Sequence, residues 1–282
     1  MLWCDGHLVE GPVPFDLSDR GLLLGDGVFD TALALDGRIA FEEAHVARLV
    51  AAGDALGFRV DPARVVEAMR AVAGASPRAA IRTTVTRGPG PRGIAPPADP
   101  TPFVFASAAP ARAALVFAPT RLVPTAIRRN ETSPAARLKT LGYLDAVLAA
   151  REATAAGFDE ALFLNTRGRV ACAGTGNLFA VFGDALATPP AGEGVLPGIV
   201  RAEVLRLASK LGLRVQERPI GPDELERADA VFLTNSLRLI APVTAVGETR
   251  FVSEGHPVLA GLIAGLREAV ALSCGVAGTG RA

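Results

Sequence analysis

The spacing of apolar residues divides the chain into helix-like and strand-like segments. Apolar residues three and four positions apart predict helices over residues 42–56 and 62–72. A β-rich pattern predicts a strand over residues 80–86, and glycines punctuate a strand-like segment over residues 21–41. We therefore expect a small α/β unit in the first part of the chain.

The second half alternates helical and strand patterns after a proline-rich stretch. We predict a helix over residues 139–156 and a helix of about 13 residues that opens after the loop at residues 196–198 and is closed by Gly212. The predicted strands in this half are residues 160–165, 177–183, 214–220 and 230–236, and a short acidic helix is predicted over 222–228. The fold class is α+β, with a small domain over residues 1–117, a linker over 118–126 and a larger domain over 127–282.

Composition narrows the class of partner. The 29 basic and 29 acidic side chains cancel, and 50% of the 282 residues are hydrophobic, as in ordinary globular proteins. A nucleic-acid or membrane-surface binder would carry a basic surface, so neither partner is expected. No apolar run reaches the roughly 20 residues of a membrane span, and the start of the chain does not resemble an export signal. We expect a cytoplasmic protein that acts on small molecules.

Metal binding is also not expected, because the three cysteines show no CxxC spacing and there are only three histidines. The lysines carry more information, since only Lys139 and Lys210 occur among the 29 basic residues. Lys139 begins an apolar helical pattern, where a buried ammonium is costly unless it serves a purpose such as forming a Schiff base. Lys210 falls at a polar mid-helix position and is expected to face solvent. Tyr143, the single tyrosine, lies four residues after Lys139, on the same face of the predicted helix.

Two turns have the geometry of anion sites. In VLPGIVRAEV the backbone N–H groups of residues 198–200 open a helix, where the helix dipole favours negative charge. In LTNS the hydroxyls of Thr234 and Ser236 follow a strand. Each feature alone is also typical of an ordinary helix start or strand-end turn.

Taken together, eight stretches in order resemble the class IV aminotransferases, the pyridoxal-phosphate enzymes of fold type IV. This family includes branched-chain aminotransferases, D-amino-acid transaminases and aminodeoxychorismate lyases. The resemblance implies a small N-terminal α/β domain, a larger C-terminal pseudo-barrel domain, pyridoxal 5'-phosphate as cofactor and a homodimer with the site near its interface. The stretches are DRGLLLGDGVFDT, HVARL, TRGPGPRG, RLKTLGYLDAVLA, FDEALFLNTRGRV, GTGNLFAV, LPGIVR and LTNSLRLIAPV.

The resemblance also implies roles for individual residues. Lys139 matches the lysine that forms the internal aldimine and shuttles a proton, and Arg48 matches the arginine that binds the cofactor phosphate. The other cofactor-binding positions implied are the backbone amides of Ile199 and Val200 and the hydroxyl of Thr234 at the phosphate, the Tyr143 phenol at the ring oxygen, and Leu196 against the ring. Val200 replaces a usual threonine, so one hydroxyl contact is lost.

Cys172 is the sharpest departure from the family pattern. The family typically has a glutamate here, which keeps the pyridine nitrogen of the cofactor protonated. A thiol is a weak donor and no counter-ion. We therefore expect Cys172 to leave the ring a poorer electron sink, unless Asp159 or Glu160 substitutes.

Substrate contacts are assigned by the same resemblance. Arg92 matches an arginine that can hold a substrate carboxylate, and its planar fork suits that anion. A solvated loop arginine is an equally simple interpretation. Thr31, Gly174 and Thr175 lie in the matching stretches and are further substrate-binding candidates. Position 94, where D-amino-acid transaminases often carry histidine, is isoleucine.

Three functions remain open at this point. The first is an aminotransferase that moves an amino group between a branched-chain or D-amino acid and a 2-oxo acid. The second is an aminodeoxychorismate lyase that releases 4-aminobenzoate and pyruvate, to which TNSL at residues 234–237 is similar. The third is a weakly active or non-catalytic cofactor-binding relative, for which Cys172 is the reason.

Overall fold

The structure is a computed structural model that describes residues 1–275. The chain forms two compact units. The first unit contains residues Met1–Ala113, Leu138–Gly142 and the described residues from Val270 onward, and the second contains Ala114–Arg137 and Tyr143–Ala269. None of the helices within residues 1–275 is long and apolar enough to cross a membrane.

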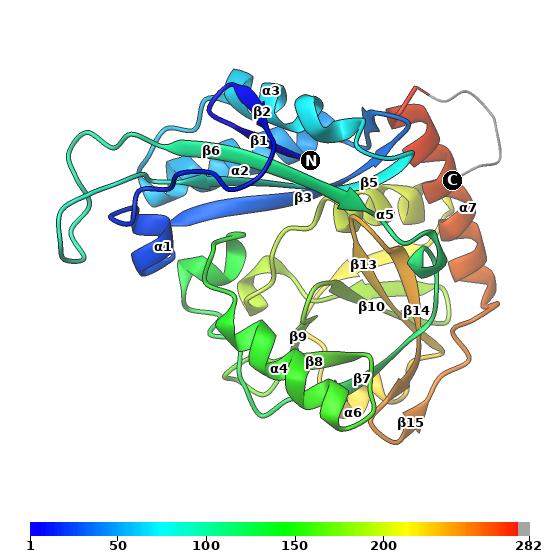
Figure 1. Ribbon diagram of the computed structural model, residues 1–282. Helices are drawn as coiled ribbons and strands as arrows, with labels where there is room; N and C mark the ends of the chain where they lie inside the picture. Colours follow the sequence, from blue (N-terminus) through cyan, green and yellow to red (C-terminus); the bar gives the residue numbers. More distant parts are fainter. Residues whose placement is uncertain (276–282) are drawn as a thin grey trace. The chain divides into compact units, whose positions relative to one another are not determined.

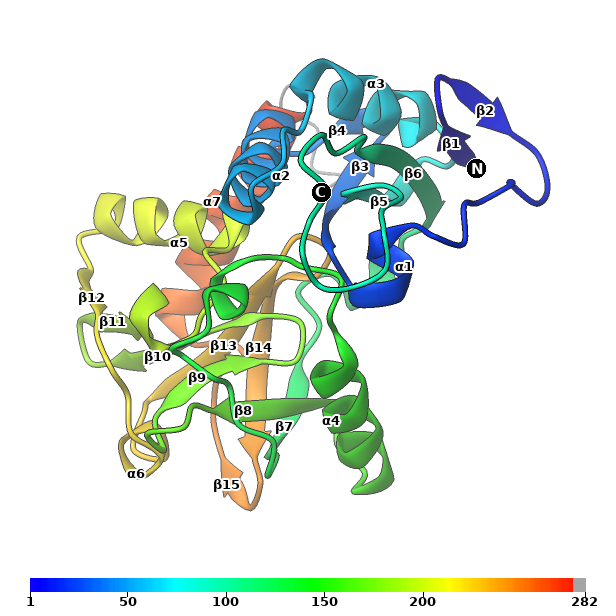
Figure 2. The ribbon, with the colours of Figure 1, turned by 90° about the vertical axis from the view of Figure 1, so that its left-hand side faces the viewer.

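The first unit is built on a six-stranded antiparallel sheet with the order β2-β1-β6-β5-β3-β4. Helices α2 and α3 lie along one face of this sheet (Figures 1 and 2). The strands are β1 (Leu2–Cys4), β2 (His7–Val9), β3 (Gly27–Leu35), β4 (Arg38–Ile39), β5 (Arg78–Thr86) and β6 (Phe103–Pro110), and the helices are α1 (Arg20–Leu24), α2 (Glu42–Leu56) and α3 (Pro62–Ala73).

Local sequence signals explain the two covering helices. Pro62 opens α3, and the Asp61 carboxylate accepts the N–H of Ala63 as a cap. Helix α2 ends at Leu56, and its C-cap residue Gly57 has a φ of 77°, which glycine adopts at little cost. The expected helix over residues 42–56 is confirmed at both ends.

The second unit contains a closed, barrel-like sheet (Figure 2). Strands β10-β13-β14-β7-β8-β9 pair in that order, and a pairing between β9 and β10 closes the ring. The apolar barrel interior includes Leu178 of β10 and Val231 of β13. On the opposite face of these two strands, the rings of Phe179 and Phe232 stack with centroids 4.9 Å apart. The strands are β7 (Thr120–Pro124), β8 (Glu160–Leu164), β9 (Val170–Ala173), β10 (Asn177–Phe182), β11 (Ala185–Thr188), β12 (Arg214–Glu217), β13 (Ala230–Asn235), β14 (Leu239–Val246) and β15 (Thr249–Arg250).

Four α-helices follow the start of the second unit: α4 (Leu144–Ala155), α5 (Ile199–Lys210), α6 (Pro222–Leu225) and α7 (Pro257–Ser273). Single 3-10 turns occur at Ala113–Leu115, Pro134–Arg137 and Ala191–Glu193. The predicted helix over residues 222–228 is therefore shorter than expected, since α6 ends at Leu225.

The predicted helix over residues 139–156 is wrong at its start. Helix α4 begins only at Leu144, and Tyr143 is its N-cap residue. Lys139 lies instead in an extended segment that pairs with the open edge of β3. That edge offers backbone groups that must be paired when buried, and the Leu141 N–H makes a hydrogen bond to it before the helix starts. Lys139 and Tyr143 therefore do not share a helix face.

The segment 118–126, expected as a linker, contains strand β7. This strand pairs in parallel with β14 and with β8 inside the barrel. Pro124 is its last residue, a position where the missing N–H costs the sheet little. The prolines that suggested a linker therefore mark the borders of a strand.

Candidate active site

Lys139 is fixed to strand β3 by its main chain. The backbone N–H of Phe29 donates to the Lys139 carbonyl at 2.9 Å, and the N–H of Leu141 donates to the Gly27 carbonyl at 3.1 Å. The Lys139 ammonium lies over the ring of Phe29, with Nζ 4.5 Å from the ring centroid. Two hydrogen bonds and a cation–π contact thus define the position of this half-buried lysine.

A second cationic side chain, Arg82, lies over the ring of Phe29. The guanidinium carbon of Arg82 lies 3.6 Å from the centroid of Phe29. Arg82 is the strand partner of Thr31, and both side chains line a hollow of about 760 Å³ within the first unit. Arg82 was not predicted as a site residue, although it is the one charge inside the β5 segment AIRTTVT.

Arg48 is held by a buried carboxylate. Asp30 accepts Arg48 Nε at 2.8 Å on one oxygen and Arg48 Nη2 at 2.7 Å on the other. His45, one helical turn before Arg48, places Nδ1 2.8 Å from the same carboxylate. Asp30 and His45 are each 1% exposed, whereas the Arg48 side chain is 16% exposed. Neither Asp30 nor His45 was predicted, although an acid inside the apolar strand GVFDTALAL was a usable signal.

Arg92 lies in an exposed loop, and one arginine binds the backbone of the next three residues of that loop. Arg20 donates Nη1 to the carbonyls of Gly93 and Ala95 and Nη2 to the carbonyl of Ile94, at 2.9–3.2 Å. Arg20 Nε also donates to Asp26 at 2.8 Å. The loop that carries Arg92 is thus tied to a buried charge network.

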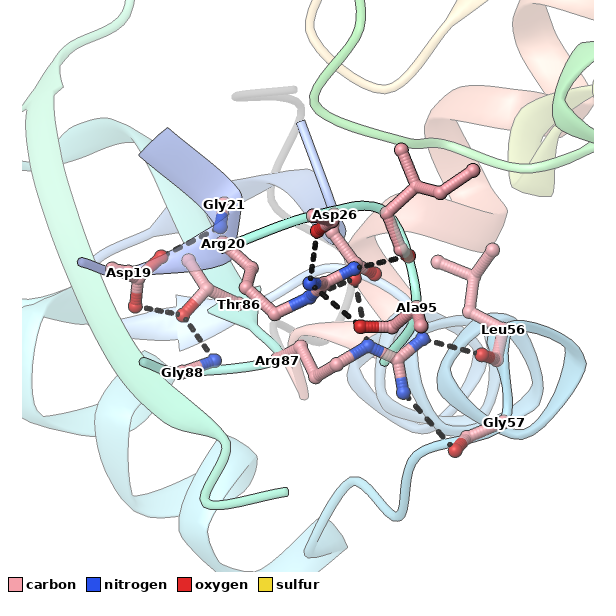
Figure 3. Close-up of polar contacts among 12 residues, drawn as sticks. Asp19, Arg20, Gly21, Asp26, Leu56, Gly57, Thr86, Arg87, Gly88 and Ala95 are labelled. Carbon is pink, nitrogen blue, oxygen red and sulfur yellow. Dashed lines mark hydrogen bonds and ion pairs between the residues drawn. The ribbon is translucent and has the colours of Figure 1, made fainter. Parts of the chain in front are cut away.

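The network continues to the end of helix α2. Asp26 also accepts Arg87 Nε at 2.8 Å, and Arg87 donates to the carbonyls of Leu56 and Gly57 (Figure 3). Burial alone would raise the pKa of Asp26, but hydrogen bonds and charge from Arg87 and Arg20 outweigh it and hold that pKa below its ordinary value. Asp26 therefore stays ionised and links the loop to α2.

In the second unit, Asn177 organises the start of helix α5. Its Nδ2 donates to the Leu196 carbonyl at 2.9 Å, and its Oδ1 lies against Gly198, the N-cap residue of α5. Among the described residues no side chain caps this helix end. The first backbone N–H groups of Ile199 and Val200 therefore lie at the positive end of the helix dipole without a side-chain acceptor, as in a typical anion site.

Thr234 lies beside this helix start. It is the strand partner of Asn177 across β10 and β13. The Thr234 residue is 2% exposed, and within residues 1–275 its hydroxyl has no hydrogen-bond partner. Buried hydroxyls are nearly always paired, so an unpaired one next to an anion site suits a ligand oxygen.

Cys172 is the partner of Asn177 on the other side, across β9 and β10. It is buried among apolar side chains that include Phe163. Burial raises the pKa of the Cys172 thiol, Glu160 adds to the effect, and the nearby Arg129 guanidinium opposes it only in part. The thiol is therefore neutral near pH 7.

Glu160 is committed to the turn after Cys172. One carboxylate oxygen accepts the backbone N–H of Thr175 at 2.6 Å and the Thr175 hydroxyl at 2.9 Å. A Cβ on Gly174 would come 3.5 Å from that oxygen. Asp159, the other carboxylate considered, accepts from Arg121 at the surface. Both carboxylates thus already have partners.

The structure therefore groups the candidates in two sets. Thr31 lies in strand β3, Lys139 pairs with β3 through its main chain, and Arg48 binds Asp30 of β3. Arg92 lies in the loop that Arg20 binds. Cys172 and Thr234 flank Asn177, which holds the loop of Leu196 and the start of α5 with Ile199 and Val200. Tyr143 is half-buried at the start of α4, and Gly174 and Thr175 form the turn between β9 and β10.

Within the described chain, no cluster of three or more His, Cys, Asp or Glu side chains could hold a metal.

Comparison of the sequence with models of known protein families identifies the family of this chain. The family model described as amino-transferase class IV matches residues 27–246, most of the chain. The chain belongs to the class IV aminotransferases. The expected fold, a small α/β domain with a larger barrel-containing one, is thereby confirmed as that of this enzyme family.

Its relatives include enzymes of two activities. A putative branched-chain-amino-acid aminotransferase of Methanocaldococcus jannaschii is 36% identical over 253 residues, 86% of each chain. The crystal structure of Escherichia coli branched-chain amino acid aminotransferase matches with a TM-score of 0.87 at 26% identity, covering 99% of this chain and 96% of that one. The 4-amino-4-deoxychorismate lyase of Pseudomonas aeruginosa matches with a TM-score of 0.85 at 32% identity, covering 95% and 98%.

Proposed function

We propose that the protein is a pyridoxal-phosphate-dependent aminotransferase that moves an amino group between an amino acid, branched-chain or D, and a 2-oxo acid. The observation that carries this proposal is the fixed placement of Lys139 on the edge of β3, in a chain of the class IV aminotransferase family, whose cofactor lysine Lys139 resembles. The similarity to the Methanocaldococcus jannaschii relative supports transfer of an amino group to or from branched-chain substrates.

The start of α5 would suit the phosphate of this cofactor, because its first N–H groups have no side-chain cap and the Thr234 hydroxyl has no partner among residues 1–275. In the first unit, the family resemblance assigns Arg48 to the same phosphate. A side chain at position 198 would fill the approach to the helix, since its Cβ would lie 2.0 Å from Asn177 Oδ1. We assign Ile199, Val200, Thr234 and Arg48 to the phosphate and Leu196 and Tyr143 to the ring.

The bound cofactor would supply an aldehyde for covalent attachment and an aromatic ring that accepts electrons. Lys139 would hold the cofactor covalently through Nζ. The Lys139 amine would also take up a proton at the substrate α-carbon and return it as a general base and acid. Arg92 holds the substrate carboxylate, and Thr31, Gly174 and Thr175 contribute to substrate binding.

In this proposal, Cys172 lowers the rate of the first half reaction. Cys172 stands where the family has the glutamate for the pyridine nitrogen, and a neutral thiol there would not keep that nitrogen protonated, so the cofactor would withdraw electrons from the substrate less strongly. We expect Cys172→Glu to increase the rate of the first half reaction by about tenfold or more, equivalent to roughly 1.4 kcal/mol of barrier. An unchanged rate and unchanged cofactor spectrum would contradict this role of Cys172.

The second candidate is an aminodeoxychorismate lyase, favoured by the match to the Pseudomonas aeruginosa lyase over nearly both whole chains. Incubation with L-leucine, D-alanine or aminodeoxychorismate in turn separates the two. Amino transfer to 2-oxoglutarate or pyruvate supports the aminotransferase, and 4-aminobenzoate supports the lyase. Bound cofactor with no spectral change across a broad amine panel would instead support a non-catalytic relative.

Two further properties belong to this proposal. We expect a homodimer, as the family resemblance implies, and a cytoplasmic location. Light scattering on the purified protein tests the first expectation.

A further inference from the structure

The buried carboxylate of Asp30 has no role in the proposed chemistry. It projects from β3 toward α2, and its oxygens accept Arg48 Nε, Arg48 Nη2 and the backbone N–H of Thr31, while His45 Nδ1 lies 2.8 Å away. An aspartate that is 1% exposed is costly to bury and needs a compensating arrangement.

The compensation is electrostatic. Burial alone would raise the pKa of Asp30, but the hydrogen bond from His45 and the charge and hydrogen bonds of Arg48 outweigh it and hold that pKa far below its ordinary value. Asp30 is therefore charged at neutral pH, and Arg48 is its counter-ion.

The contacts of Asp30 also fix the orientation of the Arg48 side chain. The two Asp30 oxygens take Nε and Nη2, one edge of the planar guanidinium, which fixes both the plane and the rotamer of Arg48. His45 and Arg48 are three residues apart on α2, so both reach Asp30 from one helix face. Arg48 is the most exposed member of the three, at 16% of its side chain.

We propose that Asp30, supported by His45, is a positioning residue that presets the Arg48 guanidinium for the cofactor phosphate. This inference rests on the proposed function, which assigns Arg48 to that phosphate. Asp30 acts only through Arg48. A guanidinium that is already oriented loses less conformational freedom when it binds a phosphate.

The test compares pyridoxal phosphate with pyridoxal, which lacks the phosphate, in equilibrium binding to the purified protein. Asp30→Asn, which replaces an acceptor oxygen with an NH₂ group, is measured beside Arg48→Met and the double variant. We expect both single variants to weaken binding of pyridoxal phosphate by at least tenfold and of pyridoxal by less than twofold. The double variant is expected to bind no more weakly than Arg48→Met. Asp159→Asn, which alters a surface ion pair, is the control and should change neither affinity.

The binding results distinguish a failure of the Asp30 inference from a failure of the Arg48 assignment. If Asp30→Asn weakens both ligands equally, Asp30 is only a structural tie between β3 and α2, and the inference is overturned. If Arg48→Met also fails to discriminate between the ligands, the assignment of Arg48 in the proposed function is wrong. Should Asp30→Asn not fold, Asp30→Glu and His45→Asn take its place. Each disturbs the same contacts, and the ratio of the two affinities is read in the same way.

Discussion

Gly198 and Asn177 are in such close contact that no larger residue fits at position 198. A Cβ built on Gly198 would lie 2.0 Å from Asn177 Oδ1 and 3.2 Å from the Cβ of Arg201. Asn177 cannot turn away without losing its hydrogen bond to the Leu196 carbonyl. The start of helix α5, whose N–H groups have no side-chain cap among the described residues, is therefore positioned by one glycine and one amide.

Gly198→Ala is expected to destabilise the protein by about 1–3 kcal/mol, the range for overpacking, and to weaken cofactor binding at least tenfold. Urea unfolding and cofactor titration measure the two effects. Gly221→Ala is the matched control, because Gly221 is also a helix N-cap in extended conformation but has nothing within 4 Å of its Cβ position. If Gly198→Ala and Gly221→Ala changed the free energy of unfolding and the cofactor affinity equally, the close contact between Gly198 and Asn177 would be contradicted.

Thr234→Val separates stability from cofactor binding. The Thr234 hydroxyl is buried without a partner among residues 1–275, so its removal should leave the free energy of unfolding unchanged or slightly higher. Affinity for pyridoxal phosphate should fall several-fold. Thr188→Val serves as control, because the Thr188 hydroxyl donates to the Leu178 carbonyl at 2.7 Å and its loss should cost about 1–3 kcal/mol of stability. A large loss of stability in Thr234→Val would argue that its hydroxyl has a partner within the protein.

Arg20→Lys tests the role of the loop that carries Arg92. A lysine has a single nitrogen and cannot reach Asp26 and three consecutive carbonyls together. We expect the KM for the amino-acid substrate to rise about tenfold while kcat changes less than twofold, with faster proteolysis within residues 91–96. Arg64→Lys, at a partly exposed ion pair, should change neither parameter. A fall in kcat without a change in KM would show that the loop does not serve substrate binding.

The pH dependence of stability follows from Asp26. Its folded-state pKa lies below the ordinary 3.8, so its ionised form stabilises the folded protein above that pH. This contribution is lost as the pH falls from about 4 through the folded-state value. Urea unfolding at pH 6 and pH 3 should show a smaller loss of stability in Asp26→Asn than in the unaltered protein. An identical loss in both proteins would mean that Asp26 is not preferentially ionised in the fold.

Local patterns were sufficient to predict the elements whose ends are determined locally. Helix α2 has an apolar face and a terminal glycine, and both ends agree with the prediction. Helix α4 does not, because the residues before it pair with β3, more than 100 positions earlier in the chain. Strand β7 was hidden for the same reason, since its partners β14 and β8 are distant in sequence.

The candidate site shows the same division. Lys139 stood out because lysine is rare in this chain, and the α5 start because a glycine precedes an apolar helix. Asp30, His45 and Asn177 were not found, because their importance lies in contacts with side chains or loops on other elements. Hydrogen bonds across a sheet and a helix leave no periodic pattern in the sequence.

The most direct test of the role of Lys139 is borohydride reduction of the purified protein loaded with pyridoxal phosphate, followed by peptide mass spectrometry. We predict that the reduced cofactor is attached to the peptide containing Lys139 and that Lys139→Ala takes up no covalent label while remaining folded. Attachment to Lys210, or no attachment at all, would contradict the assignment of Lys139 as the cofactor-bearing residue.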